Sequence, residues 1–126
     1  MIIASVSENK DFEKRISITP EISKKYINLG FEVHLSENYG EHLGFRDDEF
    51  ISRGVKIFSD EKKILENADI IIQMGLLDEN KTSVLKPNQT FVGVLNPYEN
   101  KIRLDELSKK KVNLFSLEML PRITRA

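Results

Sequence analysis

The sequence predicts a doubly wound α/β domain with a mostly parallel sheet of about five or six strands and helices on both faces. Short apolar runs alternate with helical patterns along all 126 residues, and no repeat or linker interrupts them. Three consecutive isoleucines at 70–72 are typical of a strand buried on both faces of a parallel sheet. Strands separated by single helices require right-handed crossovers, which place helices on both faces. Residues 1–126 are therefore expected to form one domain.

The first part of the chain predicts two strands and a well-capped helix. Residues 2–6 form an apolar run that is typical of a buried strand. Thr19 is the expected helix N-cap, because Pro20 suits the first helical position and Gly30 can end the helix in the left-handed conformation. Apolar and polar residues alternate strictly over residues 31–37. This alternation predicts a strand with one solvated face at an edge of the sheet.

The rest of the chain repeats the same order of elements. The expected helices are residues 47–53, 59–67 and 101 to the lysines at 109–111, and the expected strands are residues 55–58, 68–75, 90–95 and 111–119. Gly54 is expected to close the first of these helices, Ser59 to open the second and Asn100 to cap the third. Three apolar residues of the third helix are expected to face the core: Ile102, Leu104 and Leu107.

Composition and charge exclude several classes of function. A net charge of -1 and a pI of about 6.1 provide no field that attracts a phosphate backbone, so no nucleic-acid partner is expected. The chain has no cysteine, which excludes a thiolate nucleophile and a disulfide framework. No apolar run approaches the ~20 residues that a membrane-spanning helix needs. The sequence therefore predicts a cytoplasmic protein without direct membrane insertion.

Ligands of doubly wound sheets bind beyond the carboxyl ends of the strands, so the segments after each strand are the candidate sites. These segments are residues 7–15, 37–45, 73–80, 96–100 and 120–126. None contains the glycine-rich dinucleotide motif, and Gly40 and Gly44 have the wrong spacing for it. His34 and His42 are expected to be solvated surface groups, so no metal site is expected.

Four segments together resemble the N-terminal domain shared by alanine dehydrogenase and the proton-translocating NAD(P) transhydrogenase. They are EKRISITPE at 13–21, KKYINLGFEVHLSENYG at 24–40, ADIIIQMG at 68–75 and LEMLPRITRA at 117–126. The closing Pro121-Arg122-x-x-Arg125-Ala126 is characteristic of the transhydrogenase branch. Val6 departs from the family pattern, in which a proline is frequent. The resemblance implies a Rossmann-like or flavodoxin-like fold.

The residues at the alanine dehydrogenase site favour the transhydrogenase branch. In alanine dehydrogenases an arginine, a lysine and a catalytic histidine act on a 2-oxo acid. Arg15 matches the arginine, but Gln73 and Asn96 stand at the lysine and histidine positions. Neither amide can exchange a proton near neutral pH or replace a cation opposite a carboxylate. A transhydrogenase needs no such groups, because hydride passes directly between two nicotinamides, so no catalytic residue is expected.

The resemblance implies that the chain is the first subdomain of the NAD(H)-binding alpha subunit of a transhydrogenase. That enzyme transfers hydride from NADH to NADP⁺ and couples the transfer to proton translocation. This subdomain would form one wall of the NAD(H) cleft, peripheral to the inner membrane. A Rossmann domain is expected downstream, with an NADP(H)-binding subunit and a membrane domain as partners; a homodimer is also open.

The resemblance also implies that the chain alone is an inactive fragment that binds NAD(H) weakly. Two alternatives remain for its function. One is a non-catalytic α/β binding or interaction module, and the other, less favoured, is an alanine dehydrogenase-like oxidoreductase. A glycine-rich nucleotide motif downstream of residue 126 would favour the enzyme, and a stop codon would favour the module.

Three arginines are the candidate cofactor-binding residues. The resemblance implies that Arg122 approaches the nicotinamide end of NAD(H). Arg125 is a second candidate, with pairing to an acidic neighbour such as Glu118 as the favoured alternative. Arg15 is a third, although a structural ion pair is slightly favoured over a ligand contact there.

Overall fold

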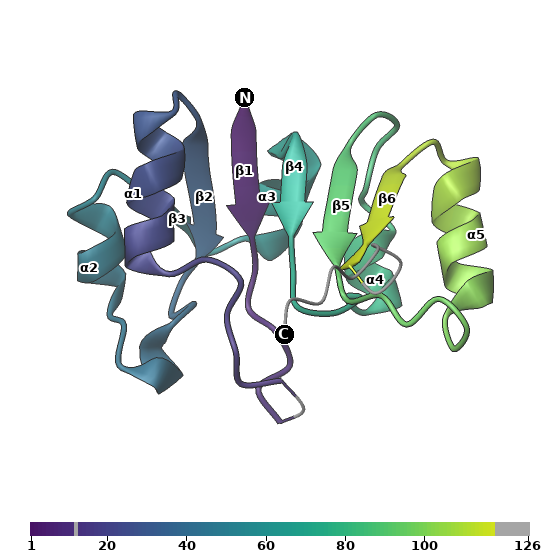
Figure 1. Ribbon diagram of the computed structural model, residues 1–126, viewed down its shortest axis with the longest axis horizontal. Coiled ribbons are helices and arrows are strands. Elements are labelled where there is room, and N and C mark those ends of the chain that lie inside the picture. The colour runs from purple at the N-terminus through teal and green to yellow at the C-terminus, as the bar shows by residue number, and fades with distance from the viewer. Residues whose placement is uncertain (12, 118–126) are drawn as a thin grey trace, which may run out of the picture.

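A computed structural model describes residues 1–11 and 13–117 (Figure 1). The described residues form a six-stranded, all-parallel sheet in the order β3-β2-β1-β4-β5-β6. The strands are β1 (Ile2–Ser5), β2 (Glu32–Ser36), β3 (Lys56–Phe58), β4 (Ile70–Ile72), β5 (Thr90–Gly93) and β6 (Asn113–Ser116). The helices are α1 (Pro20–Asn28), α2 (Asp47–Ile51), α3 (Glu61–Asn67), α4 (Glu79–Thr82) and α5 (Lys101–Lys109), with a 3-10 turn η1 (Glu41–Leu43). The predicted doubly wound α/β class is confirmed.

Two apolar clusters, one on each face, hold the helices to the sheet. Residues of α1 and α2, among them Tyr26 and Phe50, pack with Val33 of β2 on one face, which we call the α1 face. Residues of α3 and α5, such as Leu65 and Leu107, pack on the opposite face, which we call the α3 face. The predicted placement of helices on both faces is therefore confirmed.

Local capping signals account for the start of α1 and of α3 and for the end of α1. Thr19 caps α1 as predicted, and its side chain accepts a hydrogen bond from the N–H of Ile22 at 3.2 Å. Gly30 follows α1 with φ +99°, the left-handed conformation that glycine adopts without strain. The cap of α3 differs from the prediction: Asp60, not Ser59, accepts from the first free N–H groups of the helix. A carboxylate there also complements the positive end of the helix.

The prediction that residues 31–37 form an edge strand with a solvated face is wrong. β2 is an interior strand, because β3 pairs along its outer side. The face of β2 opposite α1 is covered by α3, so His34 is only 8% exposed. The centroid of its ring lies 5.0 Å from the ring centroid of Phe58. The predicted solvated position of His34 is therefore also wrong. His42 is exposed, as predicted.

One of the three predicted core positions of α5 is also wrong. Leu107 is buried and Leu104 packs against the α3-face cluster, but Ile102 is 76% exposed. Successive helical residues are separated by about 100°, so Ile102 lies about 200° around the helix from Leu104 and cannot share its face. The apolar side chain of Ile102 is consequently left in solvent.

Candidate functional site

A cavity of about 620 Å³ opens at the carboxyl ends of β1, β4 and β5. The strand order reverses beside β1. The chain runs outward from β1 through β2 to β3 and then returns to pair β4 with the other side of β1. Such a switch point is where doubly wound sheets bind ligands, and the volume is typical of small-molecule sites. The cavity is lined by Ser7, Glu8, Asn9, Glu13, Gly75, Leu76, Leu77, Asp78, Lys81, Asn96, Asn100 and Arg103. We call it the switch-point cleft.

Gln73 lies directly beneath the cleft, at the end of β4, and joins β4 to the end of β1. Its side chain is buried, with 2% of the residue exposed. Oε1 accepts from the Val6 N–H at 2.7 Å and from the Ser5 hydroxyl at 3.0 Å. Nε2 donates to the Val6 carbonyl at 3.0 Å and to a Glu8 carboxylate oxygen at 3.1 Å. Every donor of this amide has a partner, so its orientation is set by the protein.

Tyr39 extends this network under the loop that follows β1. Its hydroxyl oxygen accepts from the N–H groups of Ser17 at 3.0 Å and Ile18 at 3.2 Å. Those bonds leave the hydroxyl hydrogen to donate to Ser5 Oγ, 2.8 Å away. Ser5 in turn donates to Gln73. The loop, β1 and β4 are thus tied together by one directed chain of hydrogen bonds.

Glu8 closes the network at the wall of the cleft. One of its carboxylate oxygens accepts from the N–H of Met74, from the N–H of Gly75 at 3.4 Å and from Gln73. Burial raises the pKa of Glu8 above its ordinary value, although the hydrogen bonds from Met74 and Gln73 oppose that rise. A carboxylate therefore stands where a dinucleotide-binding turn would offer glycine N–H groups to a pyrophosphate.

The raised pKa of Glu8 predicts a pH-dependent stability. The Glu8 carboxyl of the unfolded chain has a pKa near 4.5. The folded protein keeps the proton of this carboxyl at pH values where the unfolded chain has lost it. Glu8 therefore stabilises the fold fully below the unfolded pKa, and this contribution is lost as the pH rises through the folded pKa. Glu8→Gln cannot titrate, so its free energy of unfolding should improve relative to wild type as the pH rises above 4.5. Urea unfolding between pH 4 and pH 7 measures the difference.

Glu13→Gln is the matched control for this prediction. The neighbouring Arg15 side chain lowers the pKa of Glu13 to about 2, the opposite direction from Glu8. The wild type should lose stability relative to Glu13→Gln as the pH falls from 4.5 towards 2. A difference between Glu8→Gln and wild type that stays constant with pH would show that Glu8 keeps its ordinary pKa in the fold.

The two cations that line the cleft are already engaged by groups of the protein. Lys81 Nζ lies 3.1 Å from a carboxylate oxygen of Glu61. Arg103 donates to the Leu77 carbonyl and, at 3.3 Å, to Thr82 Oγ1. These bonds reduce the capacity of both cations to hold a pyrophosphate.

Uncharged amides line the side of the cleft that follows β5. Asn100 donates from Nδ2 to the Leu95 carbonyl at 2.8 Å, which fixes the loop before α5. Asn96 borders the cavity with φ +49°, a left-handed conformation that asparagine tolerates better than most residues. Amides can pair with a ligand carboxamide as donor and acceptor but cannot transfer a proton. This side is suited to orienting a ligand.

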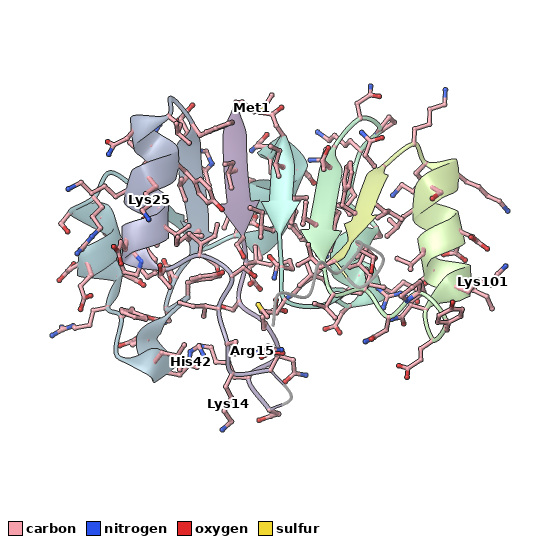
Figure 2. The ribbon with its side chains drawn as sticks, in the orientation of Figure 1. Met1, Lys14, Arg15, Lys25, His42 and Lys101 are labelled. Atoms are coloured by element: carbon pink, nitrogen blue, oxygen red, sulfur yellow. The ribbon has the colours of Figure 1, made fainter. Side chains whose placement is uncertain are left out.

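The structure describes one of the three predicted cofactor-binding arginines. Arg15 lies in the loop that extends beyond the carboxyl ends of the strands, as Figure 2 shows, and its side chain is 71% exposed. Its Nε and Nη2 donate to the two carboxylate oxygens of Glu13 at 2.8 and 2.9 Å. Glu13 lines the cleft, so this pair stands at its rim. Arg122 and Arg125 lie outside the described residues.

Neither a metal site nor a membrane-spanning helix is found among the described residues. Over residues 1–11 and 13–117, no group of three or more histidine and carboxylate side chains could hold a metal ion. In the same portion of the chain, no helix is long and apolar enough to cross a membrane.

The strand order and the position of the switch-point cleft define a Rossmann-like domain. The chain belongs to the family described as alanine dehydrogenase/PNT, N-terminal domain, whose model matches residues 5–126. An NAD(P) transhydrogenase subunit alpha protein of Rickettsia prowazekii is 33% identical over 130 residues, which cover 100% of this chain and 34% of that protein. The chain therefore spans about a third of the length of such relatives.

Other relatives come from both branches of the family. Alanine dehydrogenase 1 of Staphylococcus aureus is 29% identical over 120 residues, covering 95% of this chain and 32% of that protein. The crystal structure of a transhydrogenase from Sinorhizobium meliloti has a TM-score of 0.90 at 22% identity, covering 98% of this chain and 37% of that one. The resemblance to the family and the Rossmann-like fold are confirmed.

Sequence reasoning missed two residues that organise the cleft. Glu8 and Tyr39 lie in predicted loops without any recognisable motif, and their roles depend on contacts with residues more than 20 positions away. The one available signal for Glu8 was its position just after the first strand, where such sheets place ligand-binding groups. No sequence signal distinguished Tyr39 from the other tyrosines.

Proposed function

We propose that this chain forms one wall of the NAD(H) cleft in a proton-translocating NAD(P) transhydrogenase. The observation that carries the proposal is the replacement of ionisable groups by amides at the cleft. Gln73 is buried and fully engaged beneath it, and Asn96 borders it. A 2-oxo acid needs a cation and a proton donor, whereas direct hydride transfer needs only oriented rings. The similarity to transhydrogenase alpha subunits supports the same branch.

NAD(H) would supply the hydride, and the residues of this chain would position its nicotinamide. The switch-point cleft is lined by amides and carboxylates, and its two cations are engaged by groups of the protein, which suits a carboxamide better than a phosphate. A Rossmann domain would hold the pyrophosphate, because the turn after β1 carries Glu8 in place of glycines. The chain by itself is therefore proposed to bind NADH weakly and to be inactive. Its partners would be that domain, an NADP(H)-binding subunit and a membrane domain.

Arg122→Ala in the complete transhydrogenase tests the proposal. A guanidinium that donates to the nicotinamide carboxamide contributes a charge-assisted hydrogen bond of ~1.5 to 3 kcal/mol. Its loss should lower NADH affinity or single-turnover hydride transfer about 10- to 150-fold. Arg122→Lys should recover little, since an ammonium cannot reproduce the planar fork. The measurements are NADH titration and single-turnover transfer to an NADP⁺ analogue.

Arg15→Ala is the internal control. Its guanidinium is exposed and paired with Glu13 in the rim loop, so this change should affect turnover less than Arg122→Ala does. Hydride transfer and NADH affinity equal to wild type in a folded Arg122→Ala protein would contradict the site assignment. Failure of the complete protein to transfer hydride would favour a non-catalytic binding module.

A further inference from the structure

A separate cavity lies on the α3 face, between α3 and the outer strands β2 and β3. It measures about 120 Å³ and is lined by His34, Phe58, Lys63, Ile64 and Asn67. The last three belong to α3, which lies behind the sheet in Figure 1, and the first two belong to the paired strands beside it. None of the five residues lines the switch-point cleft. We call this cavity the α3 pocket.

His34 gives the α3 pocket a buried polar wall. The residue is buried, and its Nε2 has no hydrogen-bond partner among the described residues. Glu32 Oε1 lies 3.5 Å from this nitrogen without completing a hydrogen bond, and it accepts instead from Lys56 Nζ at 2.6 Å. A buried polar atom without a partner costs free energy, so folded proteins normally pair such atoms with a protein group, a water or a ligand. The His34 imidazole therefore calls for a partner in the pocket.

The other lining residues offer two free polar groups and two apolar walls. Lys63 and Asn67 are four positions apart on α3 and so share one face of the helix. Both are exposed, and neither side chain has a hydrogen bond or an ion pair in the described structure. Ile64 is buried in the α3-face cluster, and Phe58 is 41% exposed. The pocket thus combines donors with an apolar surface.

These groups suit a small ligand with acceptor oxygens at one end and carbon at the other. The Lys63 ammonium can only donate, an imidazole with its proton on Nε2 donates, and the Asn67 amide can donate as well. A water occupies about 30 Å³ of liquid, so a pocket of 120 Å³ has room for roughly four or five non-hydrogen atoms. A phosphate would bring more negative charge close to Glu32 and would leave the apolar walls without a partner. A single carboxylate on a short carbon chain fits both requirements.

We propose that the α3 pocket binds a short-chain monocarboxylate. Its carboxylate lies between His34, Lys63 and Asn67, and its carbon chain contacts Phe58 and Ile64. The proposal does not depend on the hydride-transfer chemistry, because the α3 pocket and the switch-point cleft share no residue. Ordered water is the competing occupant. Water would satisfy His34 without discriminating between a carboxylate and a neutral amide of the same shape.

A titration with sodium propionate, followed by nuclear magnetic resonance, tests the proposal. The isotope-labelled chain is kept at pH 7 and constant ionic strength, and the ring signals of His34 and the side-chain amide signals of Asn67 are recorded. Both sets of signals should shift and saturate. His42 is the internal reference, because it is the other histidine of the chain and its Nε2 lies 2.7 Å from the Lys14 carbonyl oxygen, outside the pocket. Propionamide and sodium chloride should cause no saturable shift.

Three variants locate the carboxylate. Lys63→Gln removes the ammonium and should weaken propionate binding about threefold or more. Lys62→Gln is the matched control, since Lys62 is an exposed lysine of the same helix that does not line the pocket, and it should bind like wild type. His34→Phe keeps an aromatic ring but cannot donate, so its binding, followed at Asn67, should weaken about tenfold or more.

Several results would overturn the proposal. Shifts at His34 and Asn67 that never saturate, or that propionamide reproduces, would assign the pocket to water. Equal affinities of Lys63→Gln and Lys62→Gln would place the carboxylate away from α3. Wild-type affinity in a His34→Phe chain that circular dichroism shows to be folded would exclude the imidazole as a donor.

Discussion

Ile71→Ala is expected to lower the free energy of unfolding by ~2 to 5 kcal/mol. Ile71 is the middle residue of β4 and has 0% exposure. It pairs with Ala4 on one side and Phe91 on the other, and all three belong to the α3-face cluster. Removing its outer carbons would leave a cavity that the surrounding close-packed strands cannot fill. A loss of this size is a large share of the stability of a small domain.

Urea unfolding of the wild-type and variant chains measures this loss. Ile102→Ala is the matched control, since Ile102 is 76% exposed and its truncation should change stability by no more than ~0.5 kcal/mol. A cost below ~1 kcal/mol for Ile71→Ala would mean that β4 is not the packed centre of the sheet.

Gln73→Leu is the second change with a large expected effect. Leucine has a similar volume but cannot hydrogen-bond, so the Val6 N–H and carbonyl would both lose their partners. Val6 is fully buried, and each unsatisfied buried group costs ~1 to 3 kcal/mol. The variant should therefore be destabilised by ~2 to 6 kcal/mol. Glu8 would also lose one of its donors and be held less firmly at the cleft.

Ser5→Ala separates this effect from a general loss of polarity. It removes one hydroxyl between Tyr39 and Gln73 and leaves both Val6 bonds intact, so it should cost ~1 kcal/mol. Urea unfolding of both variants gives the comparison. If Gln73→Leu is no more destabilised than Ser5→Ala, the Gln73 amide does not hold β1 and β4 together.

The sequence by itself determined the fold class and several boundaries, because these depend on local signals. The isoleucine run around Ile71 indicated a parallel strand buried on both faces. The strand is interior and parallel, but only its Ile71 face is fully buried, because Ile70 and Ile72 are partly exposed. Thr19 sets the start of α1 and Gly30 its end, through contacts and backbone angles within their own segment. The location of the candidate site was also predictable, since ligands of doubly wound sheets bind beyond the carboxyl ends of the strands. Gln73 and Asn96 were identified through the resemblance to the family, at the positions where alanine dehydrogenases carry a lysine and a histidine.

The tertiary structure alone decided which strands and helices became neighbours. The alternation over 31–37 is typical of a half-solvated strand, but the docking of α3 and the pairing of β3 buried His34. The contacts of Glu8 and Tyr39 join residues far apart in sequence, so no periodicity could reveal them. Long-range contacts depend on which surfaces meet in the folded chain, and residue spacing does not encode that directly.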